Sequence, residues 1–204
     1  KSLAMLQNFQ QETGQAIDIK LCGYLFLLST PAQMQQFERN VALQNSHGIK
    51  SELLTVEQIA TRVPLLDLEG IIGGSYYGGD GIADPSGVVN GYIAAARENG
   101  AHAFNGVEVT GIDVQAGAVT AVHTNNGTIQ TTTVVNAAGP WSAPIAAMAG
   151  IDLPVHPERQ QILVTTPMPT IPSDFPFIID FAQRLYFHRE GAGLLTGMSV
   201  VGEP

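Results

Sequence analysis

The chain has 204 residues, of which 45% are hydrophobic and 13% are charged, so its composition is that of a folded protein with a sizeable core. Its net charge is −9 and its nine Lys and Arg residues are scattered, which argues against nucleic acid or an anionic membrane surface as a partner. The longest apolar runs are far too short to span a bilayer.

Cys22 is the only cysteine, so an internal disulfide is impossible and a cysteine-based metal site is not expected. A single cysteine fits a reducing cytoplasm, which is the location we expect. The five histidines lack the spacing of metal ligands, so we expect no metal. The chain begins at Lys1 without an initiator Met and ends just after an apolar strand; we expect an internal fragment of a longer protein.

The first hundred residues alternate between helical and strand patterns. Helical spacing of apolar residues begins at Leu3 and stops at Gly14. Thr30-Pro31, the capping box that begins at Thr55, and Asp84-Pro85 each mark the start of a helix. The last of these helices is expected to bury Val88, Val89, Tyr92, Ile93 and Ala96. Strands are expected over residues 17–29 and 71–77.

The second half is rich in strand patterns. Asn125-Asn126-Gly127 between two alternating segments is a strong hairpin signal. A strand into Ala138 and a short helix ending at Gly150 should follow, then a loop over 167–176. Further strands are expected over residues 107–114, 160–165, 185–188 and 194–197.

These elements predict a mixed α/β (α+β) fold. Residues 81–150 have the order expected for the back half of a dinucleotide-binding, Rossmann-like domain. Residues 1–80 and 151–204 are expected to form the two parts of a second domain, around a mixed and largely antiparallel sheet flanked by helices.

The most informative stretch is Val134-Val-Asn-Ala-Ala-Gly-Pro-Trp-Ser142. Small residues at the exit of a strand let a flat ligand come close, and the start of the next helix offers unpaired N–H groups. This is where α/β folds hold nucleotide cofactors. A tightly packed turn without a ligand would give the same pattern, so both interpretations stay open.

Six segments together resemble the amine-oxidising flavoproteins, which include glycine oxidase, the sarcosine oxidases (especially the β-subunit type) and dimethylglycine dehydrogenase. The segments occur in family order and cover nearly the whole chain; they are GYLFL at 23–27, DGIADP at 80–85, VEVTGI at 107–112, VVNAAGPWS at 134–142, LPVHPERQ at 153–160 and YFHREGAGLLTG at 186–197. The resemblance implies an FAD-binding domain at 81–150 and a substrate-binding domain at 1–80 and 151–204.

The chain departs from the family pattern in two ways. It lacks the Gly-x-Gly-x-x-Gly turn that grips the FAD pyrophosphate. It also lacks the C-terminal Gly-rich segment that covers the flavin ring in the family. The resemblance therefore implies an internal fragment, with FAD absent from it or weakly bound and activity confined to the full-length protein.

The resemblance also assigns residues to the cofactor. Val109 matches the position whose backbone pairs with the adenine edge, although an ordinary inward valine fits as well. Ala137, Ala138 and Gly139 match the strand end that lies against FAD. Trp141 either forms a wall of the cofactor pocket or is a core aromatic residue.

The expected substrate-binding residues are Tyr186, His188, Arg159 and Gln160. In the family, the strand of Tyr186 and His188 crosses the substrate side of the flavin, and alternation places both on one face. Which face that is, and whether it is simply a solvated one, stays open. Arg159 either binds a carboxylate or pairs with a surface acid, and the Gln160 amide could orient substrate. No residue is assigned to catalysis.

The family implies oxidation of a small amine or N-methyl amino acid by hydride transfer to FAD. The alternatives are a flavin-dependent dehydrogenase of a hydroxy acid or glycerol-3-phosphate, and a non-catalytic subunit that kept the fold. A homo-oligomer or a partner subunit is compatible with either function.

Overall fold

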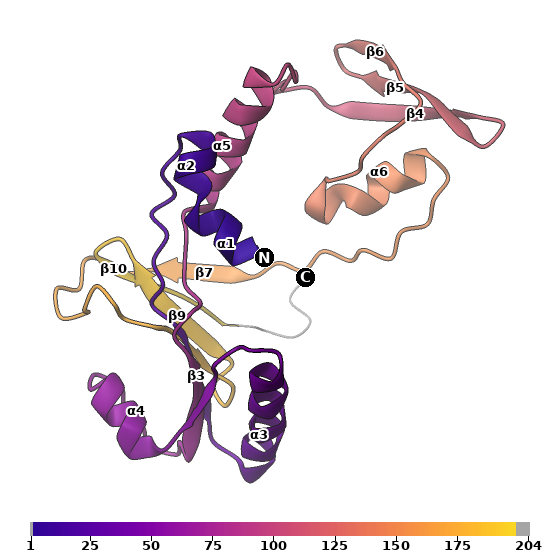
Figure 1. The fold of residues 1–204 in the computed structure, drawn as a ribbon. Helices are drawn as coiled ribbons and strands as arrows, with labels where there is room; N and C mark the ends of the chain where they lie inside the picture. Colours follow the sequence, from indigo (N-terminus) through magenta and orange to yellow (C-terminus); the bar gives the residue numbers. More distant parts are fainter. Residues whose placement is uncertain (1, 199–204) are drawn as a thin grey trace. The chain divides into compact units, whose positions relative to one another are not determined.

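The computed structural model describes residues 2–198, which form two compact units (Figure 1). Unit 1 combines residues 2–98 with residues 160–198, and unit 2 comprises residues 99–159. Residues 81–98 belong to unit 1 because they are tied to the N-terminal segment; the predicted domain bounds at 81 and 151 stay a prediction. Lys20 and Ile82 form a β-bridge, and helix α5 (Pro85–Glu98) packs on helix α2 (Phe9–Thr13).

Phe9 anchors the helical part of unit 1. Its side chain is 1% exposed, and its ring meets the edge of Tyr92 at a centroid distance of 4.9 Å. Gly91 of α5 allows this contact, because a Cβ there would lie 2.5 Å from the Phe9 ring. The expected apolar stripe of α5 is therefore wrong in part: Val89 is 55% exposed, and the buried positions are Gly87 and Gly91. Helix α1 (Ser2–Gln7) precedes α2.

A seven-stranded mixed sheet forms the rest of unit 1. Among the described strands, only the β1–β8 pair is parallel, which confirms the predicted mixed and largely antiparallel sheet. In spatial order, the strands are β2 (Glu52–Leu54), β3 (Gly73–Tyr77), β1 (Tyr24–Leu28), β8 (Phe177–Asp180), β9 (Leu185–Glu190), β10 (Gly193–Met198) and β7 (Gln161–Val164).

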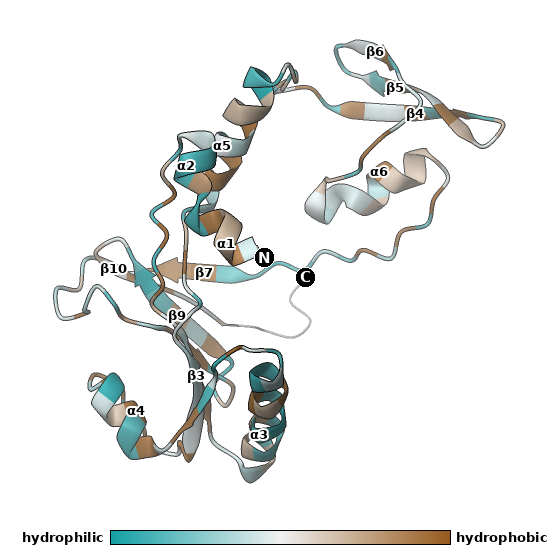
Figure 2. Ribbon diagram, in the orientation of Figure 1, coloured by the Kyte–Doolittle hydropathy of each residue, from teal (hydrophilic) through white to brown (hydrophobic). Residues whose placement is uncertain are grey.

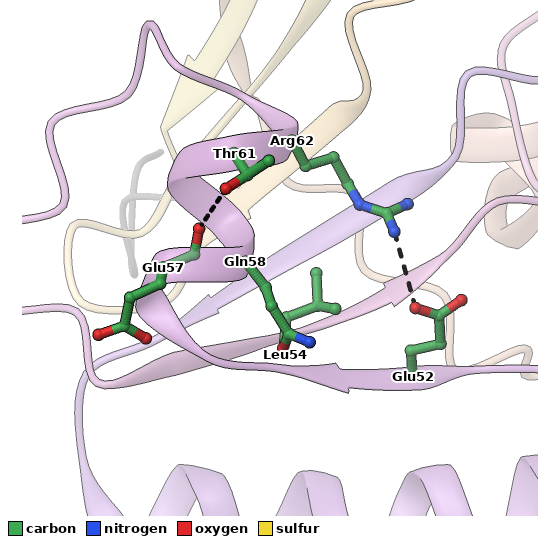
Figure 3. A pocket seen from close by; sticks show the side chains of 6 residues that line it. All are labelled: Glu52, Leu54, Glu57, Gln58, Thr61 and Arg62. Atoms are coloured by element: carbon green, nitrogen blue, oxygen red, sulfur yellow. Dashed lines mark hydrogen bonds and ion pairs between the residues drawn. The ribbon is translucent and has the colours of Figure 1, made fainter.

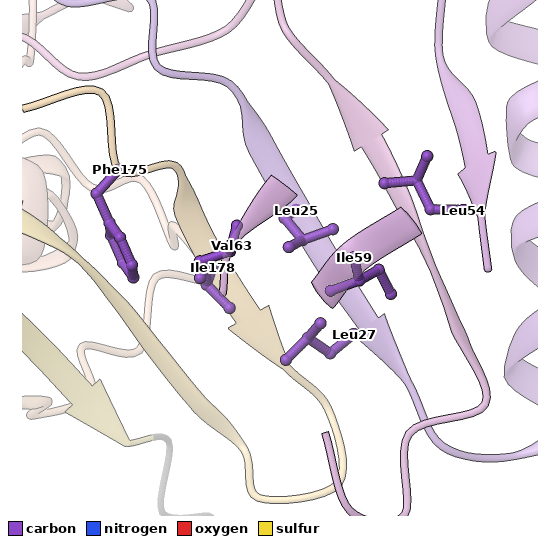
Figure 4. Close-up of a cluster of buried hydrophobic side chains, with 7 residues drawn as sticks. All are labelled: Leu25, Leu27, Leu54, Ile59, Val63, Phe175 and Ile178. Atoms are coloured by element: carbon purple, nitrogen blue, oxygen red, sulfur yellow. The ribbon is translucent and has the colours of Figure 1, made fainter. Parts of the chain in front are cut away.

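One face of this sheet carries the core of unit 1 (Figure 4). Leu25 and Ile178 pack there against Ile59 from helix α4 (Val56–Arg62), and all three are 0% exposed. Full burial of one such aliphatic side chain contributes about 1.5–3 kcal/mol to folding. The predicted capping box at Thr55 is confirmed, since the Thr55 hydroxyl accepts from the backbone N–H of Gln58.

Helix α3 (Pro31–Ser46) covers part of the opposite face. Its Phe37 ring lies 5.3 Å from the Phe26 ring and 5.7 Å from the Phe181 ring. The predicted cap at Thr30 is confirmed by reciprocal bonds with Gln33. Figure 2 shows polar and apolar residues interspersed along α3 and α4, as expected for helices with one face on a sheet.

Unit 2 is built on a three-stranded antiparallel sheet, β4 (Val109–Gln115), β5 (Ala118–Thr124) and β6 (Gly127–Gln130). The predicted hairpin at Asn125-Asn126-Gly127 is confirmed. A 3-10 turn, η1 (Gly139–Trp141), leads into helix α6 (Ser142–Met148), which packs on β4.

Three strand predictions need correction. The strand into Ala138 does not form among the described residues: residues 133–138 have no ladder partner, and Val135 is 85% exposed. A β-branched run needs a neighbouring strand to become one. The strand expected over 17–29 begins only at Tyr24, and β8 was not predicted because it is only four residues long and follows a Pro-rich loop.

No helix within residues 2–198 has the length and apolar character needed to cross a membrane.

Candidate functional site

Part of the sheet face opposite the core carries a row of aromatic rings, which we call the open aromatic face: Tyr24, Phe177, Tyr186 and His188. Phe177 is its centre, with the Tyr24 ring stacked at 4.4 Å and the His188 ring at 4.9 Å between centroids. The Tyr186 ring lies 5.7 Å from Phe177. The strand register explains the row, because Tyr24 and Phe177 are paired across β1 and β8. All four side chains are only half-buried.

This arrangement settles which face carries the two predicted substrate residues. Leu25, Ile178 and Phe187 are paired in register and point to the core, so Tyr186 and His188 point away from it. The structure thus brings Tyr186 and His188 together on a surface that no helix of unit 1 fully covers. Whether this face binds a substrate or is simply solvated stays open.

A hollow of about 510 Å³ adjoins one end of the open aromatic face, and we call it the charged hollow. Tyr24, His188 and Leu195 supply side chains from three strands, and the segments before β1 and before α5 supply charged groups. Its other lining residues are Asp18, Lys20, Gly81, Ile82, Ala83, Asp84, Pro85, Arg189, Glu190 and Gly191.

Most charges around the charged hollow already have protein partners. Lys20 Nζ lies 2.9 Å from Asp18 Oδ2. Asp84 accepts from the backbone N–H groups of Ser86 and Gly87 and so caps α5, as predicted. The Arg189 guanidinium donates to the carbonyl oxygens of Gly191 at 2.9 Å and Ile171 at 3.3 Å.

The Tyr24 phenol has a raised pKa. Burial raises the pKa of the Tyr24 phenol, and the charges of Asp80 and Cys22 raise it further. All three effects disfavour the phenolate. Tyr24 is therefore a neutral hydroxyl at physiological pH and can donate a hydrogen bond.

Gly197 is a residue of this face to which the sequence assigned no role. A Cβ at position 197 would collide with the Tyr186 ring and hydroxyl, because Tyr186 lies across its β10 partner Gly197. The signal was present in the motif at 186–197, where a glycine interrupts an apolar strand. Gly197 therefore fixes the direction in which Tyr186 lies.

Arg159 is the last residue of unit 2, and Gln160 is the first residue of the second segment of unit 1. Both are exposed and lie in the irregular stretch just before β7, whose ladder begins at Gln161. Gln160 is not among the residues that line the charged hollow. Their grouping with Tyr186 and His188 stays a prediction.

The predicted cofactor residues lie in unit 2. Val109 is half-buried at the start of β4, Ala137 is exposed and Ala138 is half-buried. Gly139 has φ +53°, and no atom lies within 4 Å of the position that a Cβ would take there. Trp141 is 70% exposed, so among the described residues it does not act as a core aromatic.

A second hollow, of about 490 Å³, lies between α4 and β2, on the core side of the sheet (Figure 3). Its charged groups are engaged in local contacts: Arg62 lies 3.6 Å from Glu52 and stacks over the Tyr76 ring at 3.9 Å. A hydrogen bond from the Thr55 side chain lowers the pKa of Glu57. These contacts stabilise the N-terminal part of the sheet and suggest no chemistry.

No cluster of three or more His, Cys, Asp or Glu side chains suited to a metal ion occurs within residues 2–198.

Comparison with known proteins decides the family. The profile of the family described as FAD dependent oxidoreductase (DAO) matches residues 1–203. The chain belongs to this family. This confirms the resemblance stated from the sequence motifs.

Relatives within the FAD dependent oxidoreductases match nearly all of the chain. Dimethylglycine dehydrogenase, mitochondrial, of Mus musculus is 29% identical over 199 residues, which are 96% of this chain and 23% of that protein. Sarcosine dehydrogenase, mitochondrial, of Mus musculus is 30% identical over 196 residues, 94% of this chain and 21% of that protein. The chain thus spans less than a quarter of the length of these two relatives.

A solved structure supports the fold. The crystal structure of L-proline dehydrogenase from P.horikoshii superposes with a TM-score of 0.89 at 31% sequence identity. The match covers 100% of this chain and 55% of that chain. The predicted fold class is confirmed by this likeness and by the mixed sheet.

The turn at 137–139 fits the family cofactor sterically. A flat ligand needs a surface without projecting side chains, and Ala137 with Gly139 provides one. The residues of unit 2 are thus compatible with FAD.

Proposed function

We propose that the protein containing this chain is an FAD-dependent oxidoreductase that oxidises a small amine or an N-methyl amino acid of the sarcosine, glycine or dimethylglycine type. Membership of the FAD dependent oxidoreductase family supports the redox chemistry. The observation that carries the substrate class is the open aromatic face beside the charged hollow, since aromatic rings bind alkylated ammonium groups through cation–π contacts.

In this proposal one set of residues contacts the substrate and another set holds the cofactor. Tyr186 and His188 contact the substrate, and Arg159 and Gln160 join them in the complete protein. Val109, Ala137, Ala138, Gly139 and Trp141 hold the cofactor. FAD, when bound, supplies the electron acceptor for the oxidation. The protein orients the amine and excludes water from it.

We propose further that the chain is an internal piece of the complete enzyme, with the substrate domain in residues 1–80 and 151–204 and the FAD domain in 81–150. The absence of a Gly-x-Gly-x-x-Gly turn from its 204 residues supports this. A cytoplasmic location is proposed from the single cysteine. Partnership with a second subunit or a second copy is also proposed, because a subunit named sarcosine oxidase beta is among the relatives.

The test is a substrate screen on the full-length protein. The protein is purified, loaded with FAD, made anaerobic and mixed in turn with sarcosine, dimethylglycine, glycine, lactate and glycerol-3-phosphate. Loss of flavin absorbance with one of the first three supports the proposal. Loss only with lactate or glycerol-3-phosphate would assign the protein to alcohol oxidation. A protein that binds no FAD, and so stays colourless after the unbound FAD is removed, would be a non-catalytic relative.

A further inference from the structure

The imidazole of His188 is held in one tautomer by the backbone. Its Nδ1 lies 2.9 Å from the carbonyl oxygen of the adjacent Arg189. A carbonyl oxygen only accepts hydrogen bonds, so in the neutral ring the proton must sit on Nδ1. Nε2 then carries a free lone pair.

That lone pair belongs to a residue of the charged hollow. His188 lines the hollow, and within residues 2–198 no protein partner of its Nε2 is found. Stacking on Phe177, with ring planes 22° apart and centroids 4.9 Å apart, fixes the plane of the imidazole. A fixed ring with one engaged and one free nitrogen is the arrangement of a general base.

The proposed reaction needs such a base. An aliphatic amine has a pKa of about 10, so the substrate arrives as an ammonium ion. An ammonium nitrogen has no lone pair with which to form the C=N bond as the neighbouring carbon is oxidised. One proton must therefore leave the nitrogen before the carbon can lose its hydride.

We propose that His188 Nε2 accepts this proton from the substrate ammonium, an inference that rests on the function proposed above. The N–H bond of the ammonium breaks, its electron pair stays on the amine nitrogen, and a new N–H bond forms at Nε2. The positive charge passes from substrate to imidazolium, and no electron acceptor takes part in this step. The imidazolium then returns its proton to water.

The other groups around the ring are suited to different tasks. Tyr24, from β1, keeps its proton because burial raises its pKa, so it donates to the substrate and does not compete for the proton. Among the charged neighbours, Lys20 and Asp18 pair with each other, and Asp84 caps α5. Arg189 donates to carbonyl oxygens, and Glu190 lies at the end of β9. His188 is thus the nitrogen base of the hollow with an available lone pair.

The experiment compares His188→Asn with wild type in the full-length, FAD-loaded protein. Asparagine keeps a donor near the place of Nδ1 for the Arg189 carbonyl and removes Nε2. His47→Asn, at an exposed histidine just after α3, is the matched control. The rate of anaerobic flavin reduction by saturating sarcosine is measured from about pH 6 to about pH 9.

For His188→Asn we expect the rate of flavin reduction to fall on the order of 100-fold at pH 7, because the bound amine must lose its proton to water instead of to Nε2. This loss in rate should shrink as the pH rises. The control should follow wild type. An equal loss at all pH values would mean that His188 only shapes the site and would overturn the proposal. Failure of wild-type protein to be reduced by any amine would instead refute the proposed function.

A second measurement does not depend on turnover. Nitrogen NMR of the full-length protein labelled at histidine shows which ring nitrogen of His188 carries the proton, with His188→Asn used to assign the signal. We expect the Nδ1–H tautomer at alkaline pH. Observation of the Nε2–H tautomer would leave no lone pair facing the hollow and would refute the inference.

Discussion

At the scale of single residues, the open aromatic face depends on side chains that hold one another in place. Tyr24 and His188 stack on the two sides of Phe177 along the row, and Tyr186 rests on Gly197. Aromatic contacts of this kind contribute about 0.5–1.5 kcal/mol beyond burial. The ring positions are therefore set before any substrate arrives.

Gly197→Ala tests the contact with Tyr186. The added methyl group would collide with the tyrosine ring and hydroxyl, so we expect a loss of about 1–3 kcal/mol in the free energy of unfolding, measured by urea denaturation. Tyr186→Phe in the same chain should recover part of this loss, because it removes the hydroxyl.

The matched control for Gly197→Ala is Gly111→Ala in β4, where the nearest atom to an added Cβ lies 3.5 Å away, at His123. That change should leave stability within about 0.5 kcal/mol of wild type. Equal losses at positions 197 and 111 would show that Tyr186 does not lie across Gly197.

Tyr24 should make the stability of the chain depend on alkaline pH. Its pKa in the folded chain is raised above the unfolded value of about 10, chiefly by burial. The folded state therefore holds the Tyr24 proton more tightly than the unfolded state. The resulting contribution to the free energy of unfolding is fully present below about pH 10 and is lost as the pH rises through the folded pKa. Unfolding by urea at a series of alkaline pH values measures the effect.

Tyr24→Phe is the comparison that isolates this effect. Phenylalanine keeps the stack on Phe177 and has no proton to lose, so its stability should fall less steeply above about pH 10. Tyr92→Phe, at an exposed tyrosine in α5, should behave as wild type does. Parallel curves for Tyr24→Phe and wild type would contradict the assignment.

At the scale of elements, the beginnings of helices are fixed by local chemistry. The Thr30 hydroxyl accepts from the Gln33 N–H, while the Gln33 side chain accepts from the Thr30 N–H. Thr30→Ala should lower the free energy of unfolding by about 1 kcal/mol. Ser46→Ala, at the other end of α3, should cost only a few tenths. Thermal or urea unfolding of the two variants gives the comparison, and equal losses would show that the cap at Thr30 is not used.

The same locality explains what the sequence could predict. The caps at Thr30, Thr55 and Asp84 and the hairpin at Gly127 depend on contacts within a few residues, and all are present. The buried side of α5 could not be predicted in this way. It depends on Phe9, far back in the chain, which selects Gly91 and leaves Val89 exposed.

The candidate site was predicted in the same partial way. Alternation placed Tyr186 and His188 on one face, but only the pairing of β8 with β1 brings Phe177 and Tyr24 beside them. That pairing joins residues more than 150 positions apart, and β8 is too short to give a periodic signal. The prediction of a strand into Ala138 was wrong for a related reason, because an extended apolar run becomes a strand only where a neighbouring strand pairs with it.

At the scale of the whole molecule, the proposed substrate residues Tyr186 and His188 lie in unit 1, and the proposed cofactor residues lie in unit 2. In the proposed function the turn at 137–139 would give FAD space, but its small side chains and one short 3-10 turn offer few groups that could hold a pyrophosphate. In dinucleotide-binding folds that task belongs to the Gly-x-Gly-x-x-Gly turn and the helix after it, and these 204 residues do not contain that turn.

The division of the cofactor site predicts how FAD binds to this chain. Titration of the 204-residue chain with FAD, followed by flavin absorbance and by equilibrium dialysis, should show no tight stoichiometric complex. The full-length protein should bind FAD in a one-to-one ratio under the same conditions.

Gly139→Val in the full-length protein should weaken that binding, because a branched side chain would occupy the open side of the turn and φ +53° is strained for it. Gly150→Val is the matched control, because Gly150, just beyond α6, also has a positive φ. This variant carries a similar backbone strain and does not block the turn at 137–139. Tight binding by the 204 residues alone would show that unit 2 grips the cofactor without a pyrophosphate turn.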